Sequence, residues 1–167
     1  MTSDFADSFS VVVETRSARW EELVPHARDL CNQAVSAAFG VAEVATEGAE
    51  VSVVLADNLF VQSLNKSWRK QDKPTNVLAF PCAEPGANHE SVHLLGDIVV
   101  ADSVVEKEAR EQGKTCAQHL AHMVVHGTLH LLGFDHLSDE KAQDMEALET
   151  QALAALNIKD PYSMDRV

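Results

Sequence analysis

The chain has 167 residues, of which 46% are hydrophobic and 23% are charged. It is long enough for one domain with a sizeable core, expected to span residues 1–167, and its composition excludes a disordered, fibrous or membrane-spanning protein. The net charge of −13 argues against broad, nonspecific binding of polyanions, so any contact with nucleic acid is expected to be local. Three widely spaced cysteines and a polar, acidic start favour a cytoplasmic location.

The first half of the chain is predicted to alternate between strands and helices. Runs rich in β-branched and other apolar residues predict strands at 9–15, 50–57 and 75–80. Apolar residues at steps of three and four predict a helix from Trp20 to Gly40, although Pro25 weakens its start. The same spacing predicts a helix over 58–69, with Asp57 as its N-terminal cap.

The second half is predicted to be mainly helical. After a loop at 81–92 and a strand at 93–101, the spacing predicts helices over 103–112, over 115–132 and from Ser138 to Leu156. About four strands and about five helices in mixed order point to an α+β fold, in which a small mixed sheet packs against the helices.

Three histidines occur in HGTLHLLGFDH, residues 126–136, at spacings of four and six residues. His126 and His130 lie on one face of the predicted helix and can direct both rings to one ion. Gly133 can adopt the left-handed conformation that ends a helix, so that the chain reverses and returns His136 from a loop. Three imidazoles with an open fourth position are typical of catalytic rather than structural zinc, so the spacing predicts a single metal site.

Residues near this motif give weaker signals. His122 lies four residues before His126 and shares its face, either lining the approach to the metal or acting as an ordinary boundary histidine. Asp135 is better placed to support the loop or a ligand than to bind the ion. The sequence assigns no role to His119, and Asp97 could orient a ligand or pair with a buried partner.

One position distinguishes the motif from that of the metzincin proteases, HExxHxxGxxH, which has the same histidine spacing. Gly127 stands where those enzymes carry the glutamate that takes a proton from the attacking water. Because glycine has no side chain for this step, peptide hydrolysis is disfavoured. The metal-binding helix itself is still expected to be metzincin-like.

A short basic segment interrupts the acidic chain. KSWRKQDK, residues 66–73, carries four cations against Asp72 alone. These cations are candidate RNA contacts: Lys66, Arg69, Lys70 and Lys73. Considered alone, the segment would be interpreted as a solvated helix end.

Several blocks of the sequence resemble one known family. The histidine motif with the preceding AHMVV, the segment NKSWRKQDKPTNVLAFP (65–81) and LLGDIVV (94–100) are similar to the YbeY family of bacterial endoribonucleases and ribosomal-RNA maturation factors. The resemblance continues in DMEALET (144–150) and DPY (160–162). The first fifty residues resemble the family only in their pattern of strands and helices.

The resemblance implies a metal-dependent endoribonuclease specific for single-stranded RNA, acting in maturation of small-subunit ribosomal RNA and in ribosome quality control. It implies that zinc is bound by His126, His130 and His136 and that Arg69 is the functionally important arginine. The implied partners are single-stranded RNA, the small ribosomal subunit and its assembly proteins. The family often has tyrosine at position 134, where Phe134 offers no hydroxyl.

Three functions therefore stay open. In an RNA hydrolase, the histidines would hold the ion and Arg69 would bind the phosphate, with His122, Asp135 or a second water as general base. In a non-catalytic ribosome-assembly factor, the metal would be structural. A metalloprotease is the least favoured, because of Gly127.

Overall fold

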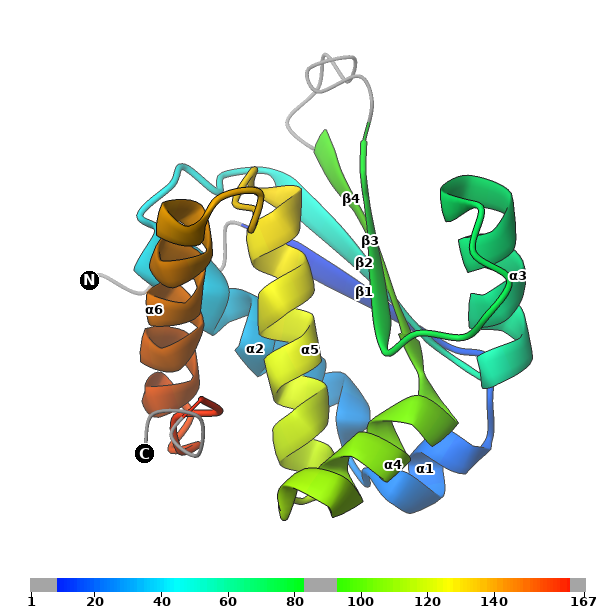
Figure 1. Ribbon diagram of the computed structural model, residues 1–167. Coiled ribbons are helices and arrows are strands. Elements are labelled where there is room, and N and C mark those ends of the chain that lie inside the picture. The colour runs from blue at the N-terminus through cyan, green and yellow to red at the C-terminus, as the bar shows by residue number, and fades with distance from the viewer. Residues whose placement is uncertain (1–8, 83–92, 163–167) are drawn as a thin grey trace.

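A computed structural model describes residues 9–82 and 93–162, so most of the loop predicted at 81–92 lies outside the described part (Figure 1). In chain order the elements are β1 (Ser10–Thr15), α1 (Arg19–Leu23), α2 (Ala27–Ala42), β2 (Ala49–Ala56), α3 (Asn58–Arg69), β3 (Val77–Pro81), β4 (His93–Ala101), α4 (Asp102–Gln112), α5 (Cys116–Leu131) and α6 (Asp139–Ala155). None of the described helices is long and apolar enough to cross a membrane.

The four described strands form one mixed sheet in the order β1-β2-β4-β3. β1 and β4 both pair parallel to β2, and β3 pairs antiparallel to β4. Helices α2 and α5 cover one face of the sheet, with α6 packed against both of them, and α3 covers the other face, whereas α4 continues directly from the end of β4 (Figure 1). The predicted α+β fold with a small mixed sheet is confirmed.

Helix α5 lies at the centre of the larger core, between the sheet and the helices α2 and α6. It begins at a capping box, in which the Thr115 hydroxyl accepts from the Gln118 amide and the Gln118 side chain accepts from the Thr115 amide. Most of its side chains are buried, including those of two histidines. A rigid, enclosed helix therefore carries the first two residues of the histidine motif.

The predicted helix from Trp20 to Gly40 is wrong as one continuous element, because the chain forms two helices there, α1 and α2, so the structure describes six helices instead of about five. The chain breaks at Pro25, which has no amide hydrogen and disfavours a helical residue before it. His26 then takes a left-handed conformation (φ 64°) and a new helix begins. That helix runs past Gly40 to Ala42, because a single glycine in a helix lowers its stability without ending it.

Candidate metal centre

The turn after α5 returns the chain towards the helix. Gly133 has a φ of 101°, and its amide donates to the carbonyl of His130 (3.0 Å). The amide of Phe134 donates to the carbonyl of Leu129 (3.1 Å). These two bonds form a Schellman motif, with Gly133 at the left-handed position that glycine favours. The reversal expected at Gly133 is thus present, and it brings His136 back over the last turn of α5.

The three histidine rings converge on one point. Their centroids are 4.6 Å apart for His126 and His130, 5.0 Å for His126 and His136, and 4.8 Å for His130 and His136. One ring nitrogen from each residue lies within 4.8 Å of the other two. Three converging imidazoles fit a divalent transition metal such as zinc and leave room for a further ligand.

The protonation state of His130 also suits a metal ligand. Burial, with a contribution from the neighbouring His126 and His136, lowers the pKa of His130 to about 4. Its ring is therefore neutral at neutral pH and has a free lone pair, which a metal ligand requires.

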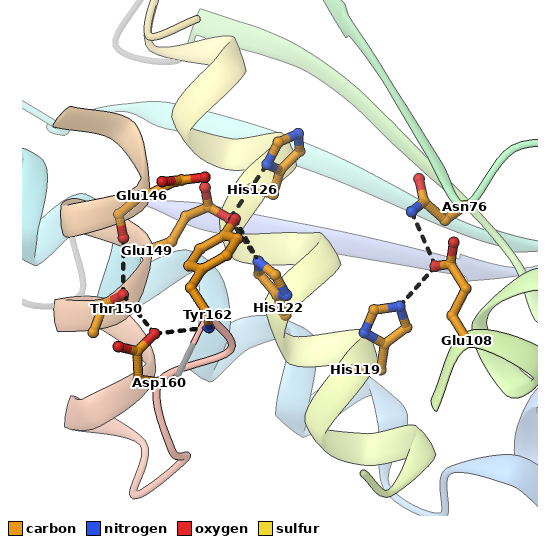
Figure 2. A network of polar contacts seen from close by, with 10 residues as sticks. All are labelled: Asn76, Glu108, His119, His122, His126, Glu146, Glu149, Thr150, Asp160 and Tyr162. Atoms are coloured by element: carbon orange, nitrogen blue, oxygen red, sulfur yellow. Dashed lines mark hydrogen bonds and ion pairs between the residues drawn. The ribbon is translucent and has the colours of Figure 1, made fainter. Parts of the chain in front are cut away.

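A buried carboxylate lies directly behind the triad. Glu149 of α6 is fully buried, and its Oε1 accepts from His126 Nδ1 (3.3 Å), His122 Nε2 (2.6 Å) and the Tyr162 hydroxyl (3.0 Å) (Figure 2). Because the Nδ1–H of His126 donates a hydrogen bond to this carboxylate, the Nε2 of that ring keeps its lone pair available for an ion. This is the usual arrangement in which an outer carboxylate fixes the tautomer and orientation of a histidine ligand.

Glu149 is charged and His122 is neutral within this network. Burial alone would raise the pKa of Glu149, but the hydrogen bonds from His122 and His126 outweigh it and lower the pKa to about 2. Burial lowers the pKa of His122 more than Glu149 raises it. A fixed negative charge therefore lies next to the place where a cation would bind.

Glu149 and Tyr162 were not predicted as site residues, although both lie in segments that resemble the YbeY family. The signal that could have identified Glu149 is its position four residues from Met145 and from Leu153, both fully buried. A carboxylate on the apolar face of a helix is rarely buried without partners.

The other histidine of α5 belongs to a separate contact. His119 is buried, and its Nε2 lies 2.8 Å from Oε1 of Glu108, which also accepts from Asn76 (3.0 Å) (Figure 2). The structure thus pairs His119 with α4 instead of the triad.

Two clefts meet at His126. The smaller, of about 600 Å³, is lined by Trp68, Arg69, Thr75, Asn76, Val77, Leu78, Ala79, Phe80, Pro81, His126, Gly127, His130 and His136. The larger, of about 740 Å³, contains His119, His122 and Tyr162 but neither Arg69 nor the other two triad histidines. The smaller cleft is the better candidate for chemistry, because it holds the complete triad together with a permanent cation.

The basic segment contributes unevenly to this cleft. Among the described residues that line it, Arg69 is the one cation from the segment. Lys66 is exposed and lies 3.9 Å from Asp72, while Lys70 ends α3 in a left-handed conformation. Lys66, Lys70 and Lys73 therefore stay predicted RNA contacts outside the cleft.

Two acidic candidates are not among the described residues that line this cleft. Asp135 accepts from the amide of Leu137 (2.9 Å) and lies 3.8 Å from Lys141, so it supports the loop that carries His136. Asp97 lies half-buried in β4, opposite Phe80.

Gly127 lies at a close contact between α5 and the sheet. A Cβ at this position would lie 2.8 Å from Cγ2 of Ile98, which is fully buried in β4. A larger side chain fits only if Ile98 or the helix shifts, so the packing as well as the sequence disfavours the glutamate of a metzincin protease at this position.

Replacing Gly127 with alanine should destabilise the protein. Overpacking against Ile98 costs about 1–3 kcal/mol, and the higher helix propensity of alanine offsets up to about 1 kcal/mol of this. We expect urea unfolding to show a net loss of about 1–2 kcal/mol. Gly40→Ala is the matched control, because a Cβ there meets nothing within 4 Å and the change should stabilise α2. Equal stabilisation by both changes would contradict the close packing at Gly127.

Comparisons with known proteins agree with this geometry. The family model described as Endoribonuclease YbeY matches residues 13–157. Endoribonuclease YbeY of Paramagnetospirillum magneticum is 44% identical over 162 residues, covering 93% of this chain and 96% of the relative. That of Azorhizobium caulinodans is 49% identical over 148 residues, covering 87% and 91%. The solution structure of TM1509 from Thermotoga maritima has a similar fold, with a TM-score of 0.52, 24% identity and coverage of 88% and 91%.

Proposed function

The chain belongs to the endoribonuclease YbeY family, and on this premise we propose that it is a zinc-dependent endoribonuclease that hydrolyses phosphodiester bonds in single-stranded RNA. The proposal extends to a cytoplasmic role in maturation of small-subunit ribosomal RNA and in ribosome quality control, with the small subunit and its assembly proteins as partners. The observation that carries it is that three converging histidines and Arg69 line one cleft.

The proposed ligands of the ion are His126, His130 and His136. An ion held there would supply Lewis-acid activation of water and of a phosphoryl oxygen. Other parts of the chain would hold these ligands in position: Glu149 orients the ring of His126, and the Schellman turn fixes the loop that carries His136.

Arg69 is the proposed phosphate-binding residue. Its guanidinium is planar and permanently charged, and it can donate two parallel hydrogen bonds to a phosphate as negative charge develops. Its position on the last turn of α3 places it on the wall of the cleft formed by the triad.

The two side chains considered as general base are both engaged elsewhere. His122 donates to Glu149, and Asp135 accepts from the amide of Leu137. Neither is among the described residues that line the cleft of Arg69. This favours water, the third candidate, as the proton acceptor.

Cleavage of end-labelled single-stranded RNA by the zinc-loaded protein tests the proposal. Arg69→Lys should lower kcat/KM about tenfold, because lysine keeps the charge but loses the bidentate geometry. Arg28→Lys, the same change at an exposed arginine of α2, should leave cleavage unchanged. No cleavage by the zinc-loaded wild-type chain would refute the proposed function, and full activity of Arg69→Lys would refute the role of Arg69.

A further inference from the structure

Trp68 is unusually exposed for a large aromatic residue. Its side chain is 71% exposed, whereas Trp20, the other tryptophan of the chain, is completely buried. Burying a tryptophan is strongly favourable, and exposed tryptophans concentrate at binding surfaces.

The position of Trp68 indicates what it could bind. It precedes Arg69 on the last turn of α3, and both residues line the cleft that holds the three histidines. Its ring makes an edge-to-face contact with Phe80 of β3, with centroids 6.1 Å apart and an interplanar angle of 61°. This contact supports the indole, and its exposed surface lies beside the proposed phosphate site.

Charge alone gives this cleft little affinity for RNA. The chain carries a net charge of −13, and Arg69 is the one cation of the basic segment among the described lining residues. A few phosphate contacts give weak, salt-sensitive binding. Base stacking on an aromatic ring needs no net charge, and it tolerates any sequence because every base has an aromatic face.

We propose that Trp68 stacks on an unpaired base of the RNA, next to the phosphate that Arg69 binds. The inference rests on the proposed function and deepens it, because it supplies a physical reason for selecting single strands. In a duplex both faces of each base are covered by neighbouring bases, so stacking on a side chain requires a base that is already free.

The test uses the zinc-loaded full chain and single-stranded 2′-O-methyl oligonucleotides of roughly eight nucleotides, which suits the usual size of such sites. A second probe has the same backbone but abasic positions throughout, so it keeps the phosphates and removes the bases. Fluorescence anisotropy of the labelled probe gives Kd for the wild type, Trp68→Ala, Trp68→Phe and Leu59→Ala. Leu59 is the control, because it is 76% exposed on the same helix and does not line the cleft.

Trp68→Ala should raise Kd for the base-bearing probe about tenfold, equivalent to about 1.4 kcal/mol, and should not change Kd for the abasic probe. Trp68→Phe should retain most of the affinity, and Leu59→Ala should match the wild type. The base-bearing probe should quench the tryptophan emission of the wild type. Trp20 contributes a constant background, which is measured alone in Trp68→Ala.

Unchanged binding of the base-bearing probe by Trp68→Ala would overturn the inference. An equal loss with both probes would also overturn it, because the effect would not depend on bases. The nuclease proposal is tested by a different result. A wild-type protein that binds the probe by stacking but cleaves no RNA would refute the nuclease activity and would still support the stacking by Trp68.

Discussion

Replacing His136 with alanine should abolish zinc binding and RNA cleavage while leaving the metal-free fold intact. His136 lies on the loop after α5 and is exposed, whereas His126 and His130 lie on the helix that packs into the core. Its removal leaves two imidazoles, which hold a divalent ion far more weakly. Outer partners of metal ligands typically contribute about 10–100-fold in affinity, so losing a ligand itself should cost more than about 100-fold.

Three measurements on the same samples check this expectation. Competition with a chromophoric chelator gives zinc affinity, cleavage of labelled RNA gives activity, and thermal unfolding in chelator gives the stability of the metal-free chain. The control is His26→Asn, at an exposed histidine between α1 and α2, because asparagine tolerates its left-handed backbone (φ 64°). Wild-type cleavage by His136→Ala would point to a contaminating nuclease.

The same variant separates the two leading functions. If the ion were structural, His136→Ala should be less stable than the wild type when both are measured in zinc. A variant that lacks metal but still supports ribosome assembly would favour the assembly-factor alternative. The structure does not require a metal to complete its core, since α5 is enclosed by apolar contacts with α2, α6 and the sheet. A catalytic ion therefore remains the better proposal.

The parts of the site that depend on local spacing could be predicted from the sequence. Two histidines four residues apart share a helix face whatever surrounds them, and a glycine after the last turn is the common way to end a helix and reverse the chain. The glycine at position 127 likewise argues against a protease from sequence alone, and its packing on Ile98 agrees with this.

The parts that depend on distant segments could not be predicted. Glu149 contacts His122 across 27 positions of sequence, and spacing within one helix cannot reveal which helix faces another. The exposure of Trp68 could not be predicted for a related reason: its spacing from Phe60 and Leu64 is that of a buried stripe. At the last turn of α3, however, its ring contacts Phe80 of β3 and its side chain stays 71% exposed. The break at Pro25, in contrast, depends on local chemistry, because proline lacks an amide hydrogen and restricts the residue before it.

Replacing Glu149 with glutamine should weaken zinc binding about 10–100-fold, the usual effect of losing an outer partner of a metal ligand. Glutamine keeps the size of the side chain but removes the negative charge that His126, His122 and Tyr162 all contact. A neutral amide accepts a weaker hydrogen bond from His126 Nδ1, so the ring is held less firmly with its Nε2 towards the ion. The nearby cation also loses its compensating buried charge.

The measurement is the zinc affinity of folded Glu149→Gln, with circular dichroism used to keep conditions below the unfolding transition. Glu146→Gln provides the matched control, because it removes the same charge one turn earlier on α6 without a side-chain hydrogen bond to the triad among the described contacts. A loss of affinity confined to Glu149→Gln would assign the effect to the contact with His126, since a general loss of negative charge should weaken both variants equally. Wild-type affinity in Glu149→Gln would show that the backbone of α5 alone orients His126, and Glu149 would then serve only to satisfy the buried His122 and Tyr162.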